Sequence, residues 1–214
     1  MVKPQAGDLV RITFVGVLDT DKSIFESTDE RVARSAGIYS QQMLYGPRLA
    51  LLGRGFMIPG LDEGISKMEA GQSAQIHVPA ALAFGERLPD LVRVMSGKEL
   101  ERTGVRPKQG MLLNIDGVQA RVKSVSSGRV VLDFNHPLAG FDLTYHVNLL
   151  EVVAEPEAKA KALGDEYHTS LRIERAADKA VIWIPKLLEA GRARGLAAQL
   201  GASVGAWADV KIES

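Results

Sequence analysis

The chain has 214 residues, of which 46% are hydrophobic and 24% charged, with 26 basic residues against 26 acidic ones. A formal net charge of zero argues against a general nucleic-acid binder, which usually carries a basic excess. The sequence has no cysteine, which excludes disulfides, thiol nucleophiles and thiolate metal sites. It has neither a secretory signal at its start nor the roughly 18-residue apolar run that crosses a membrane, so we expect a cytoplasmic protein that is not bound to a membrane.

The first third of the chain predicts strands separated by glycine-rich turns. Asp8–Leu18 is rich in β-branched residues and predicts a long strand, and Ser23–Ser27 predicts a short second one. The polar residues 28–42 show no hydrophobic period and predict a loop. Apolar residues at helical spacing predict a short helix over 61–68, and Gln75–Val78 predicts a further strand.

The middle of the chain differs in charge from its surroundings. Residues 87–134 carry nine basic and five acidic side chains, a net charge of +4, as an inserted domain might. Asp116-Gly117 is a strong hairpin signal between two apolar runs. We expect a compact β module here, with three short strands at Met111–Ile115, Gln119–Val125 and Arg129–Phe134.

The last part of the chain predicts a further small domain. Phe141–Val153 resumes strand-like alternation, and the charged, alanine-rich residues 154–166 predict a linker or a short helix. Beyond them the pattern predicts two strands, a helix over Leu188–Leu200 that ends at Gly201, and a final strand near Trp207–Glu213. This order is ββαβ.

Three separated blocks resemble the FKBP-type peptidyl-prolyl cis-trans isomerases: Ile24-Phe25-Glu26-Ser27 after the first strand, Met57-Ile58-Pro59-Gly60-Leu61-Asp62-Glu63-Gly64, and Ala83-Phe84-Gly85. Closure of the barrel is delayed by about fifty residues, until a block that starts Asn135-His136-Pro137-Leu138-Ala139-Gly140. That delay resembles the SlyD-like branch, in which an insert-in-flap chaperone domain interrupts the catalytic barrel. The C-terminal extension resembles the long archaeal members.

The resemblance implies an α+β fold. An antiparallel FKBP half-barrel would wrap around a short helix, a β-rich insert-in-flap domain would interrupt it, and the small ββαβ domain would follow. We expect the isomerase domain at 1–86 and 135–153, the insert at 87–134 and the C-terminal domain at 154–214.

The resemblance also implies a prolyl pocket, with Glu26 at the family's acidic position and the Ile58 backbone amide contacting the bound peptide. The expected site residues are Phe14, Phe25, Glu26, Met57, Ile58, Leu61, Phe84 and Tyr145. Three of them depart from the common family pattern. Leu61 replaces an aromatic floor, which predicts weak macrolide binding, Phe84 replaces a tyrosine that bonds the substrate carbonyl, and Glu26 replaces an aspartate. Taken singly, each apolar residue of the set is by default a core residue.

Prolyl isomerisation needs no nucleophile, metal or cofactor, and we expect none. Rotation about an Xaa-Pro bond is slow because it breaks amide resonance. An apolar pocket with a few placed hydrogen bonds can bind the twisted amide preferentially. A thousandfold acceleration requires only about 4 kcal/mol.

The insert is expected to hold unfolded or nascent polypeptides near the pocket, through Leu91, Val94, Met95 and Met111. Methionine suits varied partners, although each of these residues could instead fill the core of the small domain itself. Two rival functions remain open: a holdase chaperone without isomerase activity, and a docking module in which 154–214 binds a ribosome or a second subunit. The sequence identifies neither the clients nor the oligomeric state.

Overall fold

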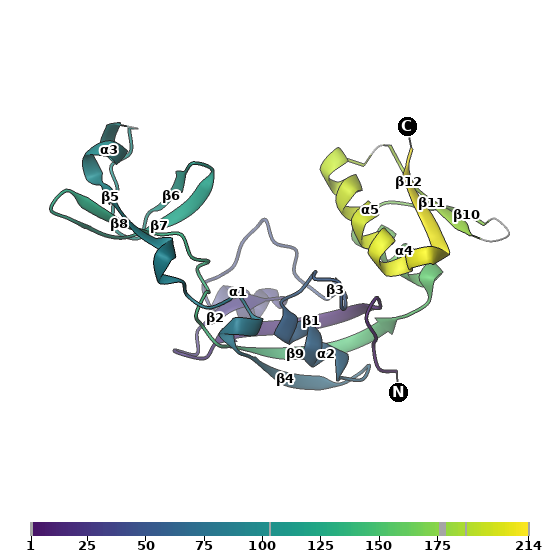
Figure 1. Cartoon of the computed structure of the whole chain (residues 1–214). Helices are drawn as coiled ribbons and strands as arrows, with labels where there is room; N and C mark the ends of the chain where they lie inside the picture. The colour runs from purple at the N-terminus through teal and green to yellow at the C-terminus, as the bar shows by residue number, and fades with distance from the viewer. Residues whose placement is uncertain (1, 103, 176–178, 187, 214) are drawn as a thin grey trace. The chain divides into compact units, whose positions relative to one another are not determined.

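A computed structural model describes residues 2–102, 104–175, 179–186 and 188–213. The chain forms two compact units, one made of 1–83 with 142–214 and the other of 84–141 (Figure 1). The α+β fold class is confirmed: a main antiparallel sheet with a helix, a separate insert sheet and a small C-terminal sheet with helices. The division into three independently folding domains, with bounds at 87–134 and 154–214, stays a proposal. No helix in the described part of the chain is long and apolar enough to span a membrane.

The main sheet has five strands and is built around one long strand, β1 (Leu9–Leu18). Strand β9 (Leu143–Val153) pairs antiparallel with β1 along its whole length, and β4 (Ser73–Val78) pairs with the far edge of β9. The other edge of β1 pairs with two strands in succession, β3 (Arg48–Leu51) and β2 (Ile24–Ser27). Sequence analysis predicted four of these strands and missed β3.

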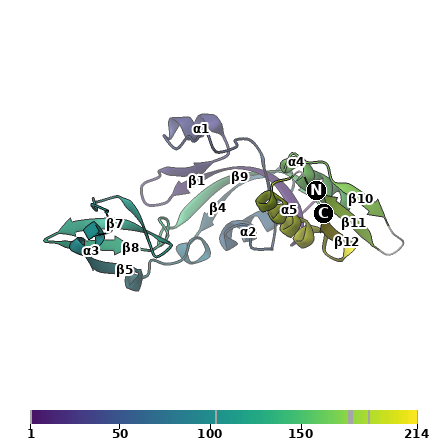
Figure 2. The ribbon, with the colours of Figure 1, turned by 90° about the horizontal axis from the view of Figure 1, so that it is seen from above.

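The predicted short helix is α2 (Pro59–Ser66), which packs against β4 and β9 (Figures 1 and 2). Two glycines four residues apart allow this close approach. A Cβ atom on Gly60 would lie 2.5 Å from Cγ1 of Val78, and one on Gly64 would lie 2.5 Å from Cγ2 of Ile76. Because no side chain fits in that space, the glycines bring α2 directly onto the sheet, where Leu61 and Ile65 are buried.

The polar stretch 28–42 contains a helix where we predicted only a loop. Helix α1 (Glu30–Ser35) starts after Asp29, whose Oδ1 accepts hydrogen bonds from the backbone N–H groups of Arg31 and Val32. Glu30 and Arg34 form an ion pair one turn apart on it. Capping and this pair stabilise a short polar helix that has only one buried residue, so no hydrophobic period marked it in the sequence.

The C-terminal part contains the predicted ββαβ order, preceded by a helix. Of the two alternatives expected for residues 154–166, a linker or a short helix, the structure has the helix, α4 (Pro156–Glu166). Strands β10 (Arg172–Arg175), β11 (Ala180–Ile184) and β12 (Ala208–Ile212) form one sheet, and α5 (Ala190–Val204) makes the crossover between the parallel β11 and β12. The predicted helix stop at Gly201 is wrong, since α5 continues to Val204 and its cap is Gly205, with φ +55°.

The C-terminal helices and sheet share one hydrophobic core with the main sheet. Leu9 of β1, Leu51 of β3 and Val153 of β9 belong to the same buried cluster as Leu163 of α4 and Leu196 of α5. The C-terminal elements are therefore joined to the main sheet by packing as well as by the chain. Their removal would expose apolar side chains of the main sheet to water.

The second unit contains a four-stranded antiparallel sheet in the order β5-β8-β7-β6. Three of the strands are those predicted: β6 (Leu112–Ile115), β7 (Val118–Ser126) and β8 (Arg129–Asp133). Sequence analysis missed β5 (Val92–Ser96) and the short helix α3 (Gly97–Arg102). The core of the sheet is small and consists of Leu100, Leu113, Ala120, Val122, Val130 and Leu132.

A buried lysine on α4 provides a test of the connection between the C-terminal part and the main sheet. The Lys159 ammonium lies 3.0 Å from Oδ1 of Asp8 and donates to the carbonyl of Gly7 at 2.7 Å. Lys159→Ala leaves the mostly buried Asp8 carboxylate without its ion-pair partner and with only the hydrogen bond from the Gln5 backbone N–H, so we expect the free energy of unfolding in urea to fall by about 3 kcal/mol. Lys161→Ala, at an exposed position of the same helix, is the matched control. Equal stability of the two variants would contradict the assigned role.

Candidate functional site

Three aromatic side chains from three strands meet on one face of the main sheet. The ring of Tyr145 on β9 lies 5.8 Å from that of Phe14 on β1 and 5.7 Å from that of Phe25 on β2, measured between centroids. Both contacts are edge-to-face, with interplanar angles of 62° and 89°. Such pairs contribute beyond their buried area, so the rings form a defined apolar surface.

A glycine that sequence reasoning missed makes room for these rings. Gly16 of β1 pairs with Tyr145 on one side and with Glu26 on the other. A Cβ atom on Gly16 would lie 2.7 Å from Cζ of Phe25, so any side chain there would displace the Phe25 ring. The available signal was an isolated glycine inside a β-branched strand, which often marks such a close approach.

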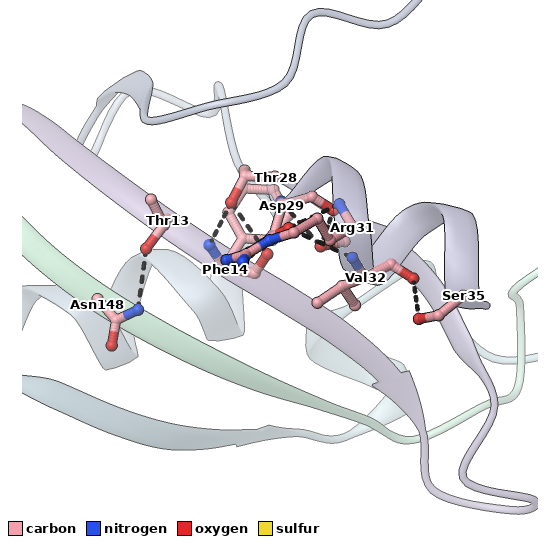
Figure 3. A network of polar contacts seen from close by, with 9 residues as sticks. Thr13, Phe14, Thr28, Asp29, Arg31, Val32, Ser35 and Asn148 are labelled. Carbon is pink, nitrogen blue, oxygen red and sulfur yellow. Dashed lines mark hydrogen bonds and ion pairs between the residues drawn. The ribbon is translucent and has the colours of Figure 1, made fainter. Parts of the chain in front are cut away.

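The backbone of Phe14 is fixed by hydrogen bonds with Thr28, shown in Figure 3. Its backbone N–H donates to Thr28 Oγ1 at 2.9 Å, and its carbonyl accepts from the backbone N–H of Thr28 at 3.0 Å. The Thr28 hydroxyl also donates to that carbonyl, at 3.2 Å. Thr28 thus satisfies the backbone of β1 at the position between its pairing with β3 and its pairing with β2, where Phe14 lies.

Glu26 and Tyr145 form the polar part of the site. Burial raises the pKa of the half-buried Glu26 carboxyl, and the positive charge of Arg48 opposes that rise. Burial and the charge of Glu26 raise the pKa of Tyr145 well above its ordinary value. The Tyr145 hydroxyl is therefore protonated at neutral pH and can act as a hydrogen-bond donor.

Two donors among the expected site residues have unused hydrogen-bonding capacity. Among the described residues, neither the Tyr145 hydroxyl nor the backbone N–H of Ile58 has a hydrogen-bond partner. Tyr145 as a residue is only 2% exposed. Among the described residues, however, no side-chain nitrogen or oxygen is both fully buried and without a hydrogen-bond partner, and this includes the Tyr145 hydroxyl. The hydroxyl consequently reaches solvent and is available to a ligand.

The remaining predicted pocket residues lie on or before α2 or in the second unit. Met57 and Ile58 are half-buried just before α2, with Ile58 as its N-cap residue, and Leu61 is buried in its first turn. Helix α2 contacts β9, the strand that bears Tyr145. Gly64 of α2 also packs on Ile76 of β4, which pairs directly with Tyr145. Phe84 belongs to the second unit, where its ring stacks on His136 at 4.3 Å.

The four client-contact candidates of the insert differ in exposure. Val94 is 62% exposed and Met111 is 42% exposed, so both present apolar surface to solvent. Leu91 is half-buried, and Met95 is half-buried against the core of the insert sheet. Leu88, Leu112, Val118 and Val125 of the same unit are also exposed.

The raised pKa of Glu26 has a consequence for stability. Below pH 4.5, the ordinary glutamate value, Glu26 is neutral, and Glu26→Gln should leave the free energy of unfolding nearly unchanged. Above that pH the wild type carries a partly buried charge that the variant lacks. The variant should therefore become progressively more stable than wild type as the pH rises, until Glu26 is fully ionised.

Urea titrations between pH 4 and pH 8 test this prediction, with Glu63→Gln as control. A hydrogen bond from Lys67 lowers the pKa of the exposed Glu63 carboxyl, so its replacement should cost stability as the pH rises. Slopes of the same sign for the two variants would show that burial does not govern Glu26.

Comparisons with known proteins agree with this geometry. The family description "FKBP26, IF domain" matches residues 93–138. The short-type peptidyl-prolyl cis-trans isomerase of Methanocaldococcus jannaschii is 29% identical over 146 residues, which cover 68% of this chain and 92% of that protein. The FKBP-type 16 kDa isomerase of Escherichia coli is 27% identical over 117 residues, 52% of this chain and 78% of that protein.

A SlyD protein is also similar to this chain. The FKBP-type isomerase SlyD of Yersinia pestis is 35% identical over 120 residues, which cover 53% of this chain and 58% of that protein. The match over 93–138 falls within the second compact unit, and the 146 residues matched to the Methanocaldococcus jannaschii isomerase are more than that unit contains. The chain is therefore similar to the FKBP-type peptidyl-prolyl cis-trans isomerases, SlyD among them, and its residues 93–138 match an insert-in-flap domain.

Proposed function

We propose that this protein isomerises Xaa-Pro bonds of unfolded or nascent polypeptides at the aromatic site and holds those polypeptides with its insert. The observation that carries the proposal is an aromatic surface of three rings that includes the Tyr145 hydroxyl, a donor without a partner in the described part of the chain. The Ile58 N–H, which has no partner there either, is assigned to the site on the resemblance. A proline ring fits an apolar surface of this kind, and the two donors could bond the carbonyls of an extended peptide.

The chemistry follows from the loss of amide resonance. The twisted Xaa-Pro amide has less charge separation than the planar one, so an apolar site favours it over the ground state. Tyr145 supplies a protonated hydroxyl, which matters because Phe84 has none. Phe14, Phe25, Met57, Ile58 and Leu61 would line the apolar part of the site, Glu26 would orient its polar edge, and Phe84 is assigned on the resemblance alone.

The insert supports the second half of the proposal with its exposed apolar side chains. Val94 and Met111 project from a unit whose core, among the described residues, holds six buried side chains. Bound there, a client chain would present its prolines to the site at a raised local concentration. A holdase without isomerase activity is the alternative, favoured by the same exposed surface, and the experiments below separate the two.

Tyr145 variants test the isomerase. Tyr145→Ala removes one ring from both aromatic pairs together with the hydroxyl, so cis-trans exchange of a short Xaa-Pro peptide should slow at least tenfold in NMR exchange spectroscopy. Tyr145→Phe keeps the ring and should lose an intermediate amount, from one hydrogen bond. Tyr39→Phe, at a tyrosine stacked on Tyr45 outside the aromatic site, is the matched control. A folded wild type without any acceleration would refute the isomerase and leave the holdase.

Deletion of the insert tests the chaperone role. The unit can be cut at its base, because Gly140 N–H donates to the Gly85 carbonyl at 2.8 Å and Asn135 bonds both backbone groups of Leu88. Replacing 87–134 by two glycines should reduce catalysis of a proline-limited refolding reaction much more than tetrapeptide isomerisation. Equal losses on both substrates would contradict a client-holding insert.

A further inference from the structure

Two opposite charges lie on the aromatic face of the main sheet, one on each side of Phe14. Strands β2 and β3 pair with the same edge of β1, so Glu26 is opposite Gly16 and Arg48 is opposite Ile12. Directly paired residues share a face, and Ile12, Phe14 and Gly16 alternate onto one face of β1. Phe14 is therefore flanked by an acid toward one end of β1 and by a base toward the other.

The two charges are held apart. Their pairing positions, Ile12 and Gly16, are four residues apart, which is about 13 Å along β1. Arg48 forms no ion pair with an acidic group in the described part of the chain, although its charge acts on Glu26. The hydrogen bonds between Thr28 and Phe14 fix the position where β3 pairing gives way to β2 pairing, and so preserve the separation (Figure 3).

The Arg48 guanidinium is oriented by one hydrogen bond and has further N–H donors free, among the described residues, for a ligand. Its Nη1 donates to the carbonyl of Leu44 at 3.0 Å, while its other N–H groups have no partner among the described residues. A guanidinium has five N–H donors in a planar fork that matches a carboxylate. The half-buried side chain thus presents a fixed cationic donor beside an apolar site.

We propose that Arg48 determines substrate specificity: it binds an acidic side chain next to the proline of the client, on one side of that proline only. The inference deepens the proposed isomerase function and rests on it. Glu26 makes the preference for an acidic residue one-sided. An acidic residue placed toward the Glu26 end of the site meets a like charge, which disfavours its binding. An extended peptide spans about 3.3 Å per residue, so neighbours of a bound proline reach the two charges separately.

Four peptides test the preference. One pair places Glu or Gln before the proline, and the other places Glu or Gln after it. With wild type, we expect kcat/KM from NMR exchange to be about tenfold higher for Glu than for Gln in one pair, and equal or lower for Glu in the other pair. The preference should weaken with added salt. Equal rates within both pairs, or an equal gain in both, would overturn the inference.

Two arginine variants assign the effect. Arg48→Gln should bring the Glu-to-Gln ratio of the selective pair close to one, whatever its absolute rate. Arg31→Gln, at a side chain that is 93% exposed, should leave the ratio unchanged. A ratio that survives Arg48→Gln would exclude Arg48 as its source. In Glu26→Gln, an acidic residue should be accepted on both sides of the proline, and a ratio that stays one-sided would refute the part assigned to Glu26.

Binding measurements keep the two proposals distinguishable. The dissociation constants of the same peptides, from NMR titration, should show the same ratio as kcat/KM. If no peptide is isomerised but the affinity ratio persists and vanishes in Arg48→Gln, the isomerase is refuted and the Arg48 assignment holds. If Gln peptides are isomerised and neither rate nor affinity responds to Glu, the inference on Arg48 alone is refuted.

Discussion

The pairing of β1 with three other strands is the constraint on which the first unit depends. Its first residues pair with β3 and pack into the core that the C-terminal helices complete, and its last residues pair with β2. Between these two pairings lies Phe14, whose backbone is satisfied by Thr28 instead of a strand. The change from β3 to β2 along the edge of β1 and the aromatic site therefore occur at the same residue, Phe14. A single continuous strand along this edge would allow no such change of partner.

The site combines groups that lower stability with groups that raise it. A half-buried carboxyl with a raised pKa and a glycine inside a strand both oppose folding to some degree. The rings of Phe14, Phe25 and Tyr145 and the close packing of α2 offset them. Such a balance is expected where a protein keeps hydrogen-bonding capacity for a ligand.

Long strands and the short apolar helix could be predicted from the sequence because each carries its own hydrophobic period. Short elements such as α1, β3 and β5 could not, since α1 is held by a polar cap and β3 and β5 are short strands defined by their partners. Of the site, Phe14, Phe25, Glu26 and Tyr145 were proposed together from the resemblance. The room that Gly16 makes for Phe25 and the position of Arg48 opposite Ile12 depend on strand register, which a single sequence leaves open.

In the sequence, the second unit is inserted between the two parts of the first, and this determines which sheet can form first during synthesis. Every strand of the insert sheet pairs within residues 92–133, whereas Leu9 of β1 has its β9 partner at Val153, and the core that buries Leu9 extends to α5. Chains emerge from the ribosome N-terminus first, and local pairings form before distant ones. The inner sheet can therefore be complete while β1 still awaits β9, so the surface that would hold clients exists before the face that would act on them.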